Sequence, residues 1–218
     1  FGEAYYLLDK DDPLKEKIHQ QREKLVSNIL NEPAYKSTAT DTTNGWTFPT
    51  WLPKVCGTDQ ASIILIGLSW MVQQSNLDGA VQKKDVLALM RHFADGILMM
   101  QFRSKGDKQD GAFLSWENLW HAYANIQSYA LLTAGQTLKD TAIINSAMYE
   151  VNTFYPSILS NGRLDHLSVR IKDGKAESYD AVTFPQIAYG VRPMVWAALK
   201  AYLMTGDTQY LVQAKELA

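Results

Sequence analysis

The sequence has one cysteine, almost no net charge and no long uninterrupted apolar run, and each shortage excludes a class of protein. A single cysteine, Cys56, forms neither an internal disulfide nor a cysteine-based metal site. A formal net charge of −2, with cations interspersed among acids, offers no basic surface to phosphate backbones, so we expect no nucleic-acid partner. The most apolar stretch, residues 61–72, is too short to span a bilayer, so we expect no membrane partner. The four histidines lack metal-ligand spacing, and we expect no metal and no cofactor.

What the sequence does have is enough apolar material for a core. Its 218 residues are 46% apolar and 20% charged, which suits one folded domain over residues 1–218. Four segments have apolar residues at helical spacing with charges on the other faces, which predicts half-exposed outer helices near residues 14–29, 86–100, 144–158 and 210–217. Between them lie segments that are apolar on nearly every face and predict buried helices, at residues 1–8, 61–72, 119–132 and 187–204.

Buried and outer helices therefore alternate, and so do the links between them. Links from a buried to an outer helix are short and rich in turn formers, at residues 9–13, 76–79, 134–137 and 205–208. Links from an outer to a buried helix are long, at residues 32–57, 104–118 and 161–186. The pattern predicts an all-α protein of about four helical hairpins that curve into an (α/α) toroid, with the long loops on one face. We expect these 218 residues to form only part of the ring. The missing hairpins would come from the rest of the same chain or from another chain.

The first long loop contains two tryptophans, Trp46 and Trp51, among turn-forming residues. Sugar rings pack their C–H faces on exposed indoles, while their hydroxyls need planar donors and acceptors. The loop therefore suggests a carbohydrate site, and both residues are candidates for binding substrate. The alternative is that the two indoles simply pin a long loop onto the helices.

The second long loop adds Trp116, and polar residues interrupt the buried helix that is expected to follow it. Trp120, His121 and Asn125 fall in the first turns of that helix, and His121 and Asn125 are four residues apart on one face. Polar groups at this place can face a water-filled cleft, so all four residues are candidates for binding substrate. The alternative for His121 is a buried histidine bonded to a carbonyl group.

The third long loop leads into a buried helix that carries Tyr189 and Arg192, which complete the candidate substrate-binding set. An arginine in an apolar helix needs a partner, either a ligand oxygen or a loop carboxylate such as Asp180. Asp110, in the second loop, is a candidate for acid or base catalysis. Its alternative role is that of a cap or turn residue.

Several short motifs resemble the six-hairpin glycosidases, including the endoglucanases of glycoside hydrolase family nine. They are residues 94–101 followed by 110–113, then Asn44-Gly45-Trp46, Gly57-Thr58-Asp59 and Thr205-Gly206-Asp207. The resemblance implies a hydrolase acting on a poly- or oligosaccharide, with Asp59 as the base that activates water in an inverting mechanism. It also favours a secreted or periplasmic location.

The chain departs from that family in two ways. Family nine enzymes place two aspartates close together for the base, whereas this motif offers one, and no acidic motif matching their catalytic glutamate occurs before Ala218. Asp59 also has an alternative role in the first turn of a helix capped by Thr58. Two further functions therefore remain open: a non-catalytic α/α scaffold that binds glycan or protein, and a polysaccharide lyase or sugar epimerase on the same fold.

Overall fold

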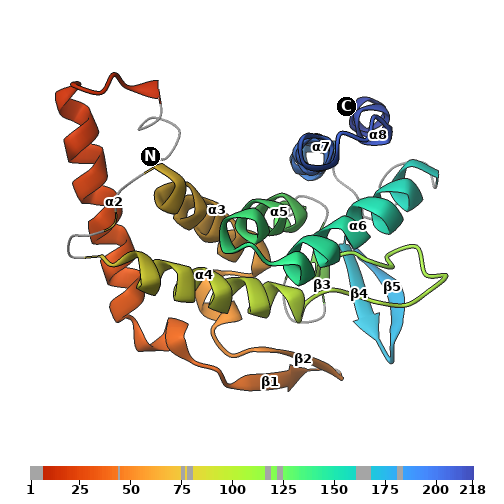
Figure 1. Ribbon diagram of the computed structural model, residues 1–218. Helices are drawn as coiled ribbons and strands as arrows, with labels where there is room; N and C mark the ends of the chain where they lie inside the picture. Colours follow the sequence, from red (N-terminus) through yellow and green to blue (C-terminus); the bar gives the residue numbers. More distant parts are fainter. Residues whose placement is uncertain are drawn as a thin grey trace.

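The computed structural model describes residues 7–43, 45–74, 77, 81–115, 119–121, 125–160, 168–180 and 184–218. More than half of these residues lie in helices, which confirms the prediction of a mainly helical protein (Figure 1). The α-helices are α2 (Pro13–Asn31), α3 (Thr58–Gln74), α4 (Lys83–Leu98), α5 (Gln127–Leu138), α6 (Thr141–Ser160), α7 (Phe184–Thr205) and α8 (Gln209–Leu217). Short 3-10 helices span Pro33–Lys36 and Leu52–Val55.

The six helices from α3 to α8 form three hairpins arranged in an arc (Figure 1). Each of α3, α5 and α7 packs against the helix that follows it in the chain, and α5 lies between α3 and α7. The outer helices repeat this order, because α6 contacts both α4 and α8. The predicted alternation of inner and outer helices is therefore confirmed for these hairpins, and the arrangement observed is an arc.

Two predicted boundaries are wrong, both around the second inner helix. That helix begins at Gln127 rather than near residue 119, and the short turn expected at residues 134–137 lies inside it. Gly135 does not stop the helix, because its role is close packing: a Cβ atom there would lie 2.6 Å from the Ile144 side chain on α6. The helix ends instead at Leu138, and its C-cap residue Lys139 adopts a left-handed conformation with φ of 55°.

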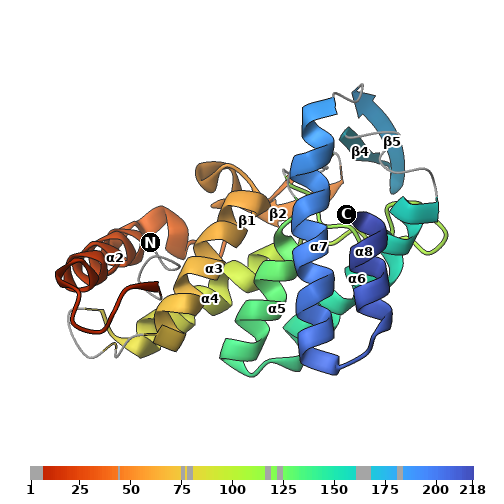
Figure 2. The same ribbon diagram turned by 90° about the horizontal axis from the view of Figure 1, so that it is seen from above.

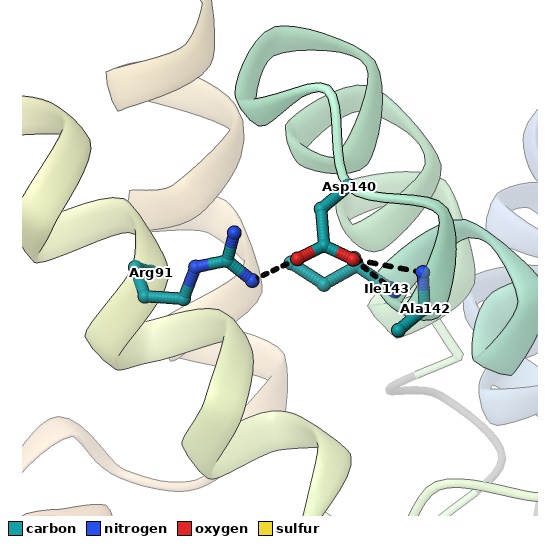
Figure 3. Close-up of polar contacts among 4 residues, drawn as sticks. All are labelled: Arg91, Asp140, Ala142 and Ile143. Carbon is teal, nitrogen blue, oxygen red and sulfur yellow. Dashed lines mark hydrogen bonds and ion pairs between the residues drawn. The ribbon is translucent and has the colours of Figure 1, made fainter.

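The outer helices are tied together at the short-turn end of the array by Arg91 and Asp140 (Figure 3). Asp140 accepts hydrogen bonds from the backbone N–H groups of Ala142 and Ile143, at 2.8 and 3.1 Å, and so caps the start of α6. The same carboxylate forms an ion pair with Arg91 of α4. The pKa of Asp140 is lowered, mainly by the hydrogen bond from the Ile143 N–H and then by the hydrogen bond from the Arg91 guanidinium.

Two small antiparallel sheets occupy the long links. Strands β1 (Thr40–Thr43) and β2 (Trp46–Pro49) form a hairpin, while β3 (Leu119–His121), β4 (Ser168–Lys172) and β5 (Lys175–Asp180) form a sheet in that order. In Figure 1 the β1–β2 hairpin lies below the helices and the second sheet lies beneath α6, and Figure 2 shows both near the ends where α3 and α7 begin. The turn between α7 and α8 lies at the opposite end (Figure 2). The described parts of the long links thus agree with the prediction that these links gather on one face.

The core fills the space between the inner and outer helix layers and extends beneath the first long link. Its largest fully buried side chains include Trp51, Phe93, Phe113, Phe154 and Tyr155. The inner helices are apolar on their outward faces, where they meet the core, and also on parts of the concave side of the arc. Within the described part of the chain, no helix is both long enough and apolar enough to cross a membrane.

Candidate functional site

Polar side chains meet at the loop-facing ends of α3 and α5. Thr58, the first residue of α3, donates its backbone N–H to the Ser115 carbonyl at 2.7 Å and its hydroxyl to the Leu114 carbonyl at 2.8 Å. The Gln127 side chain, on the first residue of α5, donates to the same hydroxyl oxygen at 2.8 Å. One threonine therefore joins the beginnings of two inner helices to the second long link. We call Thr58, Asp59, Ser115, Asn125 and Gln127 the mouth.

Asn125 extends this polar contact to the third inner helix. Its side-chain amide lies 3.4 Å from both the Gly190 carbonyl and the Met194 sulfur on α7. The residue precedes α5 instead of lying within a helix, and only 1% of its surface is exposed. The expectation that Asn125 and His121 share a helix face is therefore wrong, and Asn125 connects α5 to α7.

Asp59 is the carboxyl group of the mouth. It lies in the first turn of α3, where burial raises the pKa of its side chain and outweighs the lowering effect of hydrogen bonds from the backbone around it and from Gln60. Its buried Oδ1 atom has no hydrogen-bond partner. An acceptor that is desolvated but unpaired holds a proton more readily than an ordinary aspartate, which is a property of groups that transfer protons.

Two further buried atoms of the mouth have no hydrogen-bond partner. They are the Ser115 hydroxyl oxygen and the side-chain oxygen of Gln127, although the amide nitrogen of Gln127 is used by Thr58. Unpaired buried polar groups cost free energy and concentrate at functional or hydrated sites. Ser115 was not singled out from the sequence, because a lone serine in a loop gives no periodic or compositional signal.

Asp110, the other catalytic candidate, holds its own loop together. One carboxylate oxygen accepts from the Ser104 backbone N–H at 2.9 Å and the other accepts from the Tyr149 hydroxyl at 2.8 Å. Its carbonyl accepts from Thr153 at 3.1 Å. Tyr149 and Thr153 belong to the outer helix α6, whereas Asp59 lies on an inner helix. Asp110 is therefore engaged in a structural role, and its contacts give no support for a carboxylate pair with Asp59.

A buried glutamate, Glu150, forms a hydrogen bond with the backbone of the second long link. Glu150 of α6 accepts from the Phe113 backbone N–H at 3.1 Å, and its other oxygen lies 2.5 Å from the Ser128 hydroxyl oxygen on α5. Burial raises the pKa of Glu150 to about 8. The sequence did contain a signal for this residue, because Glu150 interrupts the apolar face that Ala147 and Phe154 define on the predicted outer helix.

The geometry at Ser128 agrees with a neutral Glu150. The Ser128 oxygen also lies 3.2 Å from the Ala147 carbonyl, which only accepts. One hydroxyl proton cannot serve both partners fully, whereas a protonated Glu150 donates to Ser128 and leaves the serine proton for Ala147. The buried group is then satisfied without a charge.

The two tryptophans of the first loop have different surroundings, and neither presents an open indole. Trp51 is 1% exposed, and its ring lies edge-on to Phe93 with centroids 5.0 Å apart. A Cβ atom on Gly96 would lie 2.1 Å from that indole, so the glycine makes room for it. The prediction of Trp51 as an exposed platform is therefore wrong. Trp46 is partly buried against Phe102, and its ring nitrogen has no hydrogen-bond partner.

The other substrate-binding candidates are only partly covered by the structure. Trp116 lies outside the described residues, as do the side chains of Trp120, His121 and Tyr189. The backbone of Trp120 and His121 forms strand β3, so the prediction that they lie on a helix is wrong. Arg192 is exposed on α7, with its guanidinium 5.1 Å from the ring centroid of Trp196.

The concave side of the arc contains a cavity of about 1000 Å³. Its walls come from α2, α3, α5 and α7, and they include three aromatic side chains that the sequence analysis did not select: Trp70, Tyr129 and Trp196. Trp196 is 39% exposed and lies 6.0 Å from Tyr129 between ring centroids. Nothing in the sequence was a reason to select these three residues, because apolar residues at helical spacing look the same whether they line a cavity or fill the core.

The cavity and the mouth are neighbours along the same helices. Ile63, which lines the cavity, is one helical turn after Asp59 on the same side of α3. Ile126, another lining residue, stands between Asn125 and Gln127. In the part of the chain that the structure describes, no three histidine, cysteine, aspartate or glutamate side chains gather as metal ligands would. The chain matches no known family model, and a search of curated proteins also found no match.

Proposed function

We propose that the protein is a glycoside hydrolase that acts on a poly- or oligosaccharide at the mouth. In this proposal Asp59 is the base that takes a proton from the attacking water. The observation that supports this most is the Asp59 carboxyl group, whose Oδ1 atom is buried and unpaired and whose pKa is raised, at the loop-facing end of an inner helix. The proposed resemblance to six-hairpin glycosidases points to the same residue and the same face.

The chemistry of the mouth suits a hydroxyl-rich ligand. Asp59 and Gln127 contribute unpaired acceptor oxygens, and Ser115 contributes a hydroxyl that both donates and accepts. Sugar hydroxyls are donors as well as acceptors, so movement of the surrounding link on binding would let them satisfy these groups. The partly buried ring of Trp46 lies in the hairpin beside this end of α3.

A second candidate function, a glycan-binding scaffold without catalysis, is favoured by a specific observation. Hydrolysis by an inverting mechanism uses two carboxyl groups about 6.5–9.5 Å apart. Of the two aspartates predicted to be catalytic, Asp110 is occupied by Ser104 and Tyr149, which leaves Asp59.

The test compares binding and hydrolysis in Asp59→Asn and the parent protein. We expect the parent to release reducing ends from at least one member of a panel of plant and bacterial glycans. Asp59→Asn should lower kcat by about 10²–10⁴-fold, the usual contribution of an acid or base, with little change in Kd measured by calorimetry. The control is Asp207→Asn, in the turn at the opposite end of the array, which should leave both values unchanged.

Three outcomes decide between the candidates. Binding without hydrolysis in the parent would replace the hydrolase with the scaffold. Equal loss of activity in Asp59→Asn and Asp207→Asn would remove Asp59 from the mechanism. A parent protein that neither binds nor cleaves any glycan would overturn the proposal.

If Asp59 acts as the base, kcat should fall as pH falls through its pKa, at a higher pH than for an ordinary aspartate.

A further inference from the structure

The concave cavity has a chemistry that saccharide binding at the mouth does not use. Most of its lining side chains are aliphatic or aromatic, including Leu25 of α2, Ile63 of α3 and Leu199 of α7. Several are well exposed, and Leu203 at the cavity's edge has 77% of its surface accessible. Exposed apolar patches of this kind mark binding surfaces, and the volume is at the upper end of the range of about 300–1,000 Å³ for small-molecule sites.

The charged groups of the cavity are all of one sign. Lys200 of α7 and Arg22 of α2 are the charged side chains that line the cavity as the structure describes it, and no aspartate or glutamate is among the lining residues. Lys200 makes no side-chain hydrogen bond or ion pair within the described part of the chain. Burial lowers its pKa, because the ammonium group is partly removed from water without a compensating anion.

A sugar is a poor match for these walls. Saccharide hydroxyls need several polar partners, whereas the described walls offer few polar side chains beside two cations. An apolar body bearing one anionic group satisfies both parts of the cavity: the chain packs against the aliphatic and aromatic side chains, and the anion pairs with the ammonium group of Lys200.

We propose that this cavity binds a single-chain amphiphile with an anionic head, such as a medium- or long-chain carboxylate, with its head at Lys200 and its chain along α3 and α7. The site is separate from the mouth and does not depend on the proposed function. Trp196 and Trp70, both in the walls, make occupancy visible by fluorescence.

The test uses two amphiphiles of equal chain length and opposite charge, dodecanoate and dodecyltrimethylammonium, each below its micelle concentration. Titration followed by tryptophan fluorescence and by calorimetry should give a dodecanoate affinity about tenfold or more above that of the cation, as expected for a charged hydrogen bond in an apolar site. Lys200→Met, which keeps the aliphatic stem and removes the charge, should abolish most of that difference. Lys215→Met, on the exposed surface of α8 and outside the cavity lining, should preserve it.

Thermal melts of both variants without ligand show whether either change affects folding. Equal affinity of the parent for the two amphiphiles, or a dodecanoate affinity unchanged in Lys200→Met, would overturn the proposal. So would a dimer in sedimentation experiments that dissociates when Leu203 is changed to glutamate, because the cavity would then be a protein interface. A Leu14→Glu variant, on the exposed face of α2 and not part of the cavity lining, is the control for that measurement.

Discussion

The mouth and the cavity are built largely from the same three inner helices, yet they differ in what their side chains need. At the mouth, polar groups near the first residues of α3 and α5 bind one another and the second long link. In the cavity, the same helices present apolar side chains and a lysine to open space. The comparison teaches that polar groups at a helix end can be satisfied by neighbouring backbone, whereas the middle of an inner helix needs an apolar partner.

This difference has a consequence for mutations. The polar groups of the mouth and of the link behind it hold the fold together, so their loss should reduce stability. Under the proposal for the cavity, its exposed rings contact the ligand, so their loss should change ligand affinity more than folding. Three predictions test the effects on stability.

The largest effect is expected from a matched pair of tryptophans. Trp51→Ala removes a fully buried ring packed against Phe93 and Gly96, and should lower the free energy of unfolding by about 3–5 kcal/mol. Trp196→Ala removes a ring that is 39% exposed in the cavity wall, and should cost clearly less. Chemical denaturation of both variants measures the two values. Similar losses would contradict the assignment of Trp51 to the core and Trp196 to an open cavity.

The second prediction concerns pH and Glu150, behind the mouth. The folded protein holds the Glu150 proton more tightly than the unfolded chain does, since burial raises its pKa from 4.5 to about 8. The free energy of unfolding should therefore fall as pH rises from 4.5 through about 8, and this contribution should be constant above that range. Denaturation curves between pH 5 and pH 9 measure the slope.

Glu150→Gln is the matched variant for this slope. Its amide donates to Ser128 and its carbonyl accepts from Phe113, so the contacts of the neutral acid remain without a group that titrates. We expect the variant to fold and to lose the part of the slope due to Glu150. An unchanged slope would show that Glu150 does not titrate in this range.

A smaller effect is expected from Thr58→Val at the mouth. The change keeps the shape of the side chain but leaves the Leu114 carbonyl and the Gln127 amide without their buried partner, which should cost about 1–3 kcal/mol. Thr133→Val is the control, because the Thr133 hydroxyl only bonds the carbonyl four residues earlier in its own helix. Equal stability of the two variants would show that the mouth does not depend on Thr58.

Local patterns in the sequence predicted the helices well and their polar ends poorly. The apolar periodicity of residues 144–158 led to α6, and the turn at residues 205–208 lies between α7 and α8 as predicted. Residues 119–121 were placed in a helix because they continue an apolar segment. They form strand β3 because they pair with β4, almost 50 residues later in the chain, and periodicity contains no information about such a partner.

The candidate site shows the same limit. Asp59 was selected from a motif and lies at the predicted end of an inner helix, where its pKa is raised. Trp51 and Asp110 were selected for their residue type and their place in the long links, and their surroundings give each a structural role: Gly96 makes room for the indole, and Tyr149 binds the carboxylate. The residue type shows which interactions a side chain can make. The neighbouring residues decide whether those interactions are already made within the protein or remain free for a ligand.

The sequence by itself determined the alternation of inner and outer helices, because helical periodicity and turn-forming residues act over a few neighbouring positions. It also determined that long links would follow the outer helices. Only the tertiary structure decided that Thr58 joins α3, α5 and the second link, that Glu150 is buried, and that Trp196 and Lys200 share a cavity. These properties depend on contacts between residues far apart in the chain, where burial and the pairing of polar groups are settled by packing.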